Sequence, residues 1–148
     1  MRAVIQRVAE ARVDSQGGVS GSIGAGLVVL LGIAKTDTHQ DADYLVDKIL
    51  NLRIFSDDSG KMNRSIIDAQ GGLLVVSNFT VYGDCRKGRR PSFDLAADPE
   101  KAQELYLYFI SRARTAPVPV ETGIFRAAMK LYLVNDGPVT LSCDSVHP

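Results

Sequence analysis

Two apolar runs place the strongest limits on how this chain can fold. Residues Gly26 to Ala34 are apolar at both alternating positions, so neither face of a strand formed here would favour contact with water. Gly71 and Gly72 open a second β run, Leu73 to Tyr82, which is rich in branched and aromatic residues. A strand that is apolar on both faces needs a covering layer on each side. We therefore expect a sheet whose centre is buried.

Further β runs lie near both ends of the chain. Arg2 to Val8 is rich in β-branched residues, and Ala11 to Val13 continues it to a turn signal at Ser15 to Gly18. Val19 to Ile23 returns from this turn. The remaining short strands that the sequence predicts are Leu52 to Phe55, Lys130 to Asn135 and Val139 to Cys143.

Two segments have helical spacing. The polar segment Asp37 to Asp41 offers helix caps, and the apolar positions that follow it from Ala42 onward are Leu45, Val46 and Ile49. Asp98 and Pro99 are typical of a helix start, because aspartate caps the first N–H groups and proline suits the first helical position. The buried stripe of this second helix is predicted to be Leu105, Phe109, Ile110 and Ala113.

The fold class follows from this order of elements. Short adjacent strands mixed with two helices predict an α+β fold with a curled, barrel-like and largely antiparallel sheet. The chain has 148 residues and no linker, repeat or low-complexity segment, so we expect one domain over residues 1–148. Hydrophobic residues make up 45% of the chain and charged residues 23%, which excludes a disordered chain, a collagen-like repeat and a disulfide-dense scaffold.

Charge and apolar content also limit the function. Lys and Arg number 17, as do Asp and Glu, so a general positive field for coating nucleic acid is excluded while local contacts to phosphates are not. The longest apolar stretch, Leu27 to Ala34, is far shorter than the roughly 20 residues of a membrane-spanning helix. Cys85 and Cys143 lie outside any CxxC pattern, and the start of the chain has no signal-peptide pattern. We therefore expect reduced thiols, a cytoplasmic protein and no membrane contact.

No familiar set of catalytic side chains is present. The two histidines, His39 and His147, lie in a polar loop and next to the last residue, where we expect both to be solvated. The sequence has no HExxH motif, no cluster of Cys and His, no P-loop, no GxGxxG and no GxSxG. The expectation is a protein without a metal and without a cofactor.

The segment Ser77-Asn78-Phe79-Thr80 contains the clearest hydroxyl candidate, Thr80. A hydroxyl nucleophile needs a base within reach, and none is evident nearby. Two other sources of catalysis are then open: backbone N–H groups that receive a developing oxyanion, and a reactive group that the substrate itself carries. The simpler interpretation of this segment is a plain buried strand.

The Gly137-Pro138 pair lies between the two closing β runs. A bond that precedes proline prefers the trans form by only about 0.5–1 kcal/mol, so a fold can select cis at low cost. A rigid cis pair would present its own carbonyl groups in fixed directions. The simpler interpretation is a hairpin turn.

A basic loop holds four cations in five residues: Arg86, Lys87, Arg89 and Arg90. It is either a solvated surface loop or a phosphate-binding element that positions RNA without reading its sequence. Phe93 and Phe125 could each stack on a base, and burial in the core is the alternative for either ring.

Together these segments resemble the D-aminoacyl-tRNA deacylase family over nearly the whole chain. The first eight residues, Met1 to Val8, and the segment Lys48 to Phe55 are similar to the family's opening strand and to its first helix with the following strand. Ser77-Asn78-Phe79-Thr80-Val81 stands where the family has Ser-Gln-Phe-Thr-Leu. Arg86 to Phe93 and Asn135-Asp136-Gly137-Pro138-Val139-Thr140 match family segments as they stand.

The resemblance implies a homodimer that hydrolyses the ester of D-aminoacyl-tRNA, and also that of Gly-tRNA(Ala), with no metal or cofactor. It implies that Gly137 and Pro138 form a cis pair that enters the site of the opposite subunit and faces its Ser77 to Thr80. The carbonyls of the pair would hold the substrate's α-amino group and leave no room for an L side chain. Arg7 would hold the pair in place, and Phe125 would pack on the terminal adenine.

For the chemistry, the resemblance implies attack by water, aided by the 2′-OH of the terminal adenosine, with main-chain donors near Phe79 and Thr80 holding the oxyanion. Thr80 as a nucleophile is the other route that the resemblance allows. We favour the RNA-assisted route because the sequence offers no partner that would activate Thr80.

Three places depart from the family pattern. Asn78 replaces the usual Gln and is one methylene shorter, and Val81 replaces Leu. Arg126 and Ala128 stand where Gly and an acidic residue are commoner, and Arg126 either contacts a phosphate or is solvated. Two other functions remain open from the sequence: a module that binds nucleic-acid ends without chemistry, and a structural dimer in which the Gly-Pro turn serves only the interface.

Overall fold

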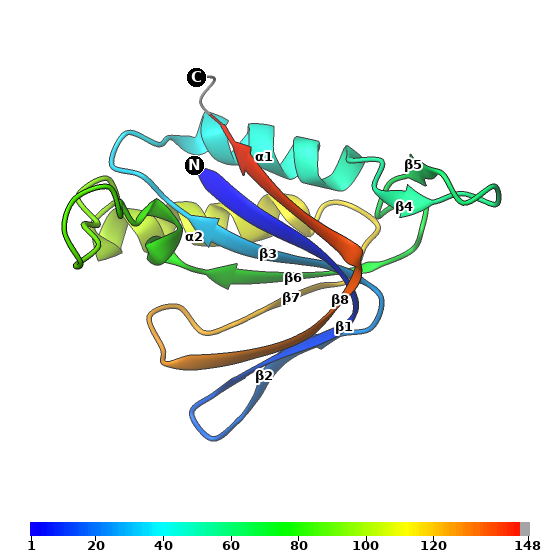
Figure 1. The fold of residues 1–148 in the computed structure, drawn as a ribbon, viewed down its shortest axis with the longest axis horizontal. Coiled ribbons are helices and arrows are strands. Elements are labelled where there is room, and N and C mark those ends of the chain that lie inside the picture. The colour runs from blue at the N-terminus through cyan, green and yellow to red at the C-terminus, as the bar shows by residue number, and fades with distance from the viewer. Residues whose placement is uncertain (146–148) are drawn as a thin grey trace.

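The computed structural model describes residues 1–145, and His147 lies outside this part of the chain. The elements in chain order are β1 (Arg2–Ser15), β2 (Gly18–Ile23), β3 (Gly26–Gly32), α1 (His39–Asn51), β4 (Phe55–Ser56), β5 (Met62–Arg64), β6 (Gly72–Ser77), the 3-10 helix η1 (Phe79–Tyr82), α2 (Pro99–Ala113), β7 (Val120–Thr122) and β8 (Met129–Asp144). Figure 1 shows both long helices on the same side of one curved sheet.

The long strand β1 organises the main sheet. Its first half pairs with β3 and its second half with β2, while β8 runs along its whole length on the other side, and all three pairings are antiparallel. Beyond β3 the sheet continues through β6 to β7 in parallel pairing. Parallel neighbours need long crossovers, and the segments that carry α1 and α2 supply them. The prediction of an α+β fold with a largely antiparallel, curled sheet is confirmed.

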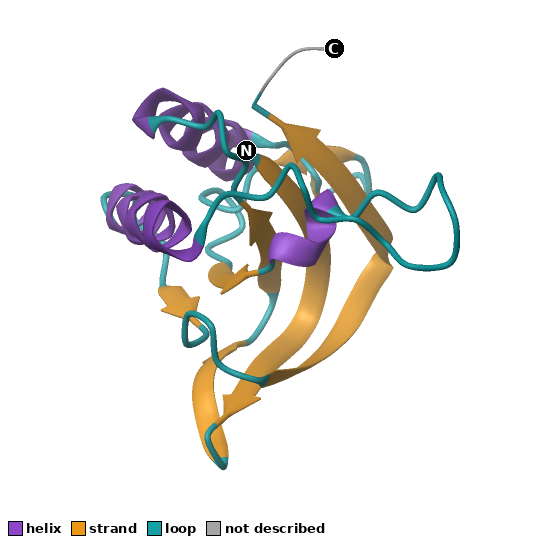
Figure 2. Cartoon of the chain, turned by 90° about the vertical axis from the view of Figure 1, so that its left-hand side faces the viewer, coloured by secondary structure: helices purple, strands orange, loops and turns teal. Residues whose placement is uncertain are grey.

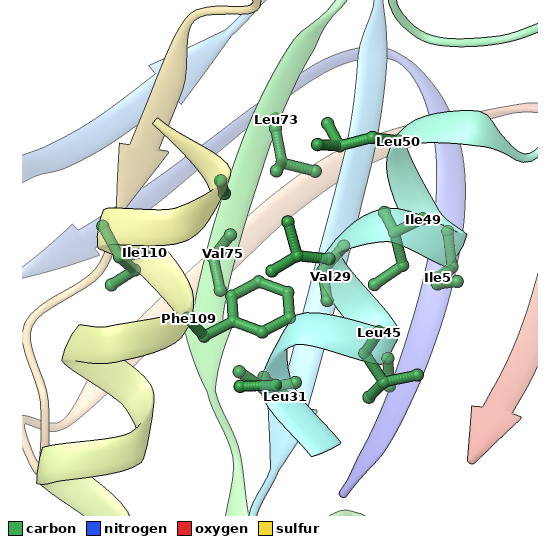
Figure 3. Close-up of a cluster of buried hydrophobic side chains, with 14 of the residues drawn as sticks. Ile5, Val29, Leu31, Leu45, Ile49, Leu50, Leu73, Val75, Phe109 and Ile110 are labelled. Carbon is green, nitrogen blue, oxygen red and sulfur yellow. The ribbon is translucent and has the colours of Figure 1, made fainter. Parts of the chain in front are cut away.

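The helices cover one face of the sheet. Val29 and Leu31 of β3 point toward α1 and α2, and the Phe109 ring of α2, which has no exposed surface, lies beside them (Figure 3). Leu27 of β3 belongs to the same cluster. Removing a buried ring of this kind costs about 3–5 kcal/mol, so this cluster contributes strongly to the stability of the fold.

The opposite face of the sheet is also covered. Val28 of β3 and the neighbouring Leu74 and Val76 of β6 belong to a second apolar cluster with Val8, Ala11 and Val13 of β1. Figure 2 shows how strongly the sheet curls, and the residues of this second cluster come from three of its strands. Strands β2 and β7 come so close that a Cβ added at Gly21 would lie 2.6 Å from the Thr122 carbonyl oxygen. The expectation that the β3 segment is covered on both sides is confirmed.

Aspartate side chains stabilise both helix starts, with Asp98 as the N-cap of α2 and Asp41 supporting Thr38, the N-cap of α1. The Asp98 carboxylate accepts the N–H groups of Glu100 and Lys101, both at 3.1 Å, with Pro99 at the first helical position as expected. Helix α1 begins at His39, ahead of the expected apolar stripe, because the Asp41 carboxylate accepts both the N–H and the hydroxyl of Thr38. Neither helix is long and apolar enough to span a bilayer, which holds for residues 1–145.

Three sequence-based predictions were wrong in detail. The strand expected from Leu73 to Tyr82 ends at Ser77, and the chain continues as η1, because the Asn78 side-chain oxygen accepts the Thr80 N–H and favours a helical turn. The strand expected from Leu52 to Phe55 is only Phe55–Ser56.

The third error concerns the two closing β runs, which form the single strand β8. Both of its halves pair with β1, through Met129 to Asn135 and through Thr140 to Asp144, and the register shifts between them. The residues around Gly137-Pro138 thus form an irregularity within one strand, so the interpretation as a hairpin turn was wrong.

Candidate active site

A mainly apolar cavity of about 530 Å³ opens where β3 and β6 end and α2 begins. It is lined by Leu31 and Ile33, by Ser77, Asn78 and Phe79, by Phe93, Ala96, Ala97, Pro99 and Ala102, and by Phe125, Arg126, Ala127 and Met129. The volume falls within the range of about 300–1,000 Å³ that is typical of small-molecule sites. Of the predicted catalytic residues, Ser77, Asn78 and Phe79 meet here, together with the predicted substrate-binding residue Phe125.

The ends of two parallel strands fix the floor of the cavity. Leu31 of β3 lies beside Ser77 of β6, and the next N–H, that of Asn78, donates to the Leu31 carbonyl at 2.8 Å. The chain then leaves the sheet as η1. Binding sites commonly lie at the carboxyl ends of parallel strands, since the chain is free to turn away there and leaves room for a ligand.

Asn78 controls the conformation of the next two residues. Its side-chain oxygen accepts both the Thr80 N–H, at 3.1 Å, and the Thr80 hydroxyl. The Thr80 hydroxyl therefore donates to a neutral amide, and Thr80 does not line the cavity. Among residues 1–145 no histidine, carboxylate or amine contacts this hydroxyl. Phe79 supplies the first N–H of η1, which has no acceptor within the helix.

Three phenylalanine rings surround the cavity mouth. Phe79 is 57% exposed and meets Phe93, itself 36% exposed, edge to face with ring centroids 5.1 Å apart. Phe125 is half-buried against Tyr106, with centroids 5.6 Å apart. Tyr106 is fixed because its hydroxyl donates to the Val75 carbonyl at 3.0 Å, and burial raises its pKa to about 12. Phe93 is thus exposed to solvent. Phe125 packs against the fixed Tyr106 ring and also lines the cavity.

Gly137 and Pro138 are exposed, and the peptide bond between them is cis, as the family resemblance implies. Neither residue lines the cavity of its own chain. The part of β1 that runs beside this pair contains Arg7, which lies opposite Leu27 near the start of β3. The cavity, by contrast, lies at the end of β3. In Figure 1 this part of β8 is the bend at the right, on the other side of the molecule from the start of α2.

Arg7 and Asn135 brace the pair. The Arg7 guanidinium donates to the Asp136 carbonyl at 3.0 Å and to the Ile54 carbonyl. The Asn135 amide accepts the Val139 N–H at 2.8 Å and donates to the Gln6 side chain at 2.9 Å. Arg7 therefore contacts the residue that directly precedes the pair. Asn135 was missed, although a side chain of this type beside Asp-Gly-Pro is a common sign of local backbone bonding.

The four cations of the basic loop are all exposed, on the green loop at the left of Figure 1. Paired backbone hydrogen bonds between Asp84 and Ser92, at 2.8 and 3.0 Å, close this loop. Arg86 binds the Asp84 carboxylate through two nitrogens at 2.8 and 2.7 Å, and this contact lowers the pKa of Asp84 to about 2. Within residues 1–145 no acidic partner contacts Lys87, Arg89 or Arg90.

Other reactive groups are dispersed. No group of three or more His, Cys, Asp and Glu residues within residues 1–145 has the geometry of a metal site. Cys85 is exposed, while burial raises the pKa of the half-buried Cys143 thiol. His39 packs edge to face on Tyr108 and lies 3.4 Å from the Glu104 carboxylate, so it joins α1 to α2.

The part of the cavity lining that the start of α2 provides was not predicted from the sequence. Pro99 was recognised only as a helix-start residue, yet it and Ala102 line the cavity. The small residues Ala96 and Ala97 just before this helix were the only available signal, since small side chains leave space.

Comparison with known proteins identifies the family. Residues 4–144 match the family described as D-Tyr-tRNA(Tyr) deacylase. The chain belongs to this family. It is 58% identical over 145 residues to a D-aminoacyl-tRNA deacylase of Solibacter usitatus, covering 98% of this chain and 96% of that one. It is 59% identical over 146 residues to a D-aminoacyl-tRNA deacylase of Thermosipho melanesiensis, covering 98% and 97%.

Solved structures have the same fold. A protein titled c-Myc DNA Unwinding Element Binding Protein is 42% identical with a TM-score of 0.94, covering 99% of this chain and 100% of that chain. A probable eukaryotic D-amino acid tRNA deacylase is 18% identical with a TM-score of 0.84, covering 97% and 98%, and this likeness supports the fold alone. The predicted resemblance to the D-aminoacyl-tRNA deacylases is confirmed.

Proposed function

We propose that this protein hydrolyses the ester bond of D-aminoacyl-tRNA, and of Gly-tRNA(Ala), in the cytoplasm. The observation that carries the proposal is the composition of the cavity. Its lining combines aromatic rings and the start of η1 with no histidine, carboxylate or lysine. Such a site can bind an aminoacyl-adenosine end, but its side chains offer no general base, so the reaction depends on main-chain donors and on the substrate.

In the proposed reaction, a water oxygen attacks the ester carbonyl carbon, and the bond from this carbon to the ribose 3′-oxygen breaks. The neighbouring 2′-OH of the terminal adenosine assists proton transfer, and the leaving 3′-oxygen gains a proton. The Phe79 N–H is the main-chain donor for the developing oxyanion, since the Thr80 N–H is already bound by Asn78. A preorganised donor of this kind contributes about 2.7–4 kcal/mol to lowering the barrier.

The handedness of the site would come from Gly137 and Pro138 of a second copy of the chain. Their exposure and the bracing by Arg7 and Asn135 support a role in which the pair is presented outward. Their carbonyls would accept hydrogen bonds from the substrate's α-amino group and exclude an L side chain. Glycine has no side chain to exclude, so glycyl esters pass the same filter.

A two-fold homodimer would bring Gly137-Pro138 of each chain to the cavity of the other. In a two-fold interface each surface contact occurs twice, so one chain supplies its Gly137-Pro138 to the partner's cavity and receives the partner's pair in return. The exposed rings of Phe79 and Phe93 at the cavity mouth support such an arrangement, because contact with a partner would remove them from water.

The basic loop would hold the RNA. Lys87, Arg89 and Arg90 are exposed and near the cavity end of the molecule, and contacts of this kind to phosphates position RNA without reading its sequence. Arg86 contributes less charge, because Asp84 neutralises it locally.

Hydrolysis of D-tyrosyl-tRNA and L-tyrosyl-tRNA by the full chain, measured in the presence of a chelator, tests this proposal. We expect rapid release of D-tyrosine and little release of L-tyrosine. Equal rates for the two enantiomers would contradict the handed filter. A D-tyrosyl substrate that ends in 2′-deoxyadenosine should react far more slowly, and an unchanged rate would return Thr80 to consideration as the nucleophile.

A binding protein for nucleic-acid ends is the second candidate. The name of the neighbour that is 42% identical describes DNA binding, and the exposed cations of the basic loop are compatible with it. This candidate predicts salt-sensitive binding of uncharged tRNA and no effect on the ester of D-tyrosyl-tRNA. The same rate measurement therefore separates the two functions.

A further inference from the structure

Of the residues that the structure describes, Arg126 alone brings a charge to the lining of the cavity. It follows Phe125 directly, in the loop between β7 and β8, and its side chain is exposed. Every other lining residue is apolar or neutral. A single cation at the mouth of such a cavity indicates that the ligand carries one negative charge close to the part that enters.

No acidic group in the described part of the chain, residues 1–145, contacts the Arg126 guanidinium. Among residues 1–145 Arg126 forms no salt bridge, in contrast to Arg2, Arg7, Arg12, Arg64, Arg86 and Arg112, which all do. Its five N–H donors are therefore available for a ligand. The planar guanidinium suits a phosphate particularly well, because two parallel N–H groups can bind two phosphate oxygens.

The backbone of Arg126 adds a second observation. Its φ of 62° lies in the left-handed region, where residues with a side chain are uncommon and glycine is favoured. The fold thus keeps a long cationic side chain at a position where a glycine would be more stable. An unfavourable backbone conformation at a cavity is a reason to look for a role of the side chain in binding.

We propose that Arg126 binds the phosphodiester group on the 5′ side of the terminal adenosine of the tRNA. This inference rests on the proposed function, in which Phe125 packs on the terminal adenine. The adenosine and its ester carry no negative charge themselves, so the 5′ phosphate is the nearest anion of the substrate. Arg126 would then set the depth at which the terminal nucleotide enters, while the basic loop holds phosphates farther along the RNA.

Two small substrates that differ only in this phosphate test the proposal. The rate constant kcat/KM is measured for 3′-O-(D-tyrosyl)-adenosine and for the same ester of adenosine 5′-monophosphate. The Arg126→Gly variant should lose about 10–100-fold on the phosphorylated ester, the range for one charge-assisted contact, and change little on the other. Arg126→Lys should recover part of the loss. An equal loss on both esters, or no loss on either, would overturn the proposal.

Folding is controlled in the same series. Because glycine tolerates a φ of 62°, Arg126→Gly should unfold at an equal or higher urea concentration than the wild type. The matched charge control is Arg114→Ala, since Arg114 follows the end of α2, about 18 Å along the helix axis from Ala102 in the cavity. R114A should hydrolyse both esters at the wild-type ratio.

A binding measurement keeps the inference separate from the proposed reaction. Calorimetry with adenosine and with 5′-AMP should show tighter binding of 5′-AMP to the wild type and no such preference in R126G. If the wild type hydrolyses neither ester but retains this preference, the proposed reaction fails and the phosphate site stands. If the wild type binds both nucleosides equally, the phosphate site is refuted even where hydrolysis is found.

Discussion

At the scale of single residues, Asn78 determines what Thr80 can do. The Asn78 side-chain oxygen receives both the N–H and the hydroxyl of Thr80, so this hydroxyl points to a group that cannot take its proton. A threonine without a base is a poor nucleophile. Asn78 thus acts as the cap of η1.

The first prediction follows for Thr80→Ala. We expect this variant to retain the rate of D-tyrosyl-tRNA hydrolysis within about tenfold, because only packing and one hydrogen bond of about 1 kcal/mol are lost. Loss of an essential nucleophile would instead lower kcat by several orders of magnitude. Single-turnover rates at saturating enzyme separate these outcomes.

A second prediction concerns Gly137, whose φ of 133° is accessible to glycine and strained for other residues. A Cβ there would lie 2.9 Å from the Val139 side chain and 2.8 Å from the Arg7 guanidinium. Gly137→Ala should therefore cost about 1–3 kcal/mol of stability and misplace the carbonyl groups of the pair. We expect D-tyrosyl-tRNA hydrolysis to fall sharply.

The matched control for this change is Gly24→Ala. Gly24 is exposed, and a Cβ added there would meet no atom within 4 Å. G24A should keep wild-type hydrolysis and unfold at the same urea concentration within error. Wild-type hydrolysis in G137A would show that the pair has no part in the site.

At the scale of elements, the basic loop contains an ion pair between Arg86 and Asp84. The contact with Arg86 lowers the pKa of Asp84 from its ordinary value of 3.8 to about 2. A carboxylate whose pKa is lowered in the folded state stabilises it above its ordinary pKa and loses this effect as the pH falls through the lowered value. The ion pair between Arg86 and Asp84 should therefore persist at neutral pH and be lost only near pH 2, where Asp84 becomes protonated.

NMR titration of the Asp84 carboxyl carbon tests this third prediction. The wild type should titrate near pH 2, and Arg86→Ala should bring the midpoint back toward 4. A wild-type midpoint near 4 would mean that the two-nitrogen contact does not persist in solution.

The elements also show how far the sequence determines the structure. The continuous apolar run predicted β3 correctly, because a short run that is apolar on both faces of a strand can be read from the local sequence. The end of β6 was not predictable in this way, since a single side-chain contact from Asn78 converts an apparently continuous β run into η1. The continuity of β8 through Gly137-Pro138 depends on pairing with β1, whose residues lie more than a hundred positions away.

In the candidate site, too, some residues were predicted from the sequence and others depend on contacts between distant segments. Ser77, Asn78, Phe79 and Phe125 were predicted through the family resemblance and meet at one cavity. Pro99 and Ala102 were not, because only the packing of α2 on the sheet brings them to the same cavity. The pairing of Arg86 with Asp84 was likewise hidden, although the two residues are only two positions apart.

At the scale of the whole molecule, the proposed site needs two copies of the chain. Within one chain the cavity and Gly137-Pro138 lie at opposite ends of β3. A complete site would therefore combine the cavity of one subunit with the pair of the other. Two inactive variants with different defects should then restore each other.

Mixed dimers of Gly137→Ala and Phe79→Ala test this claim most directly. Phe79→Ala damages the cavity but leaves the Gly137-Pro138 pair intact, so a mixed dimer has one site with both parts intact. Random mixing of equal amounts makes half of the dimers mixed, and we predict recovery of about a quarter of wild-type D-tyrosyl-tRNA hydrolysis, with L-tyrosyl-tRNA still spared. Activity that stays at the level of the separate variants, although mixed dimers have formed, would contradict a site shared between two subunits.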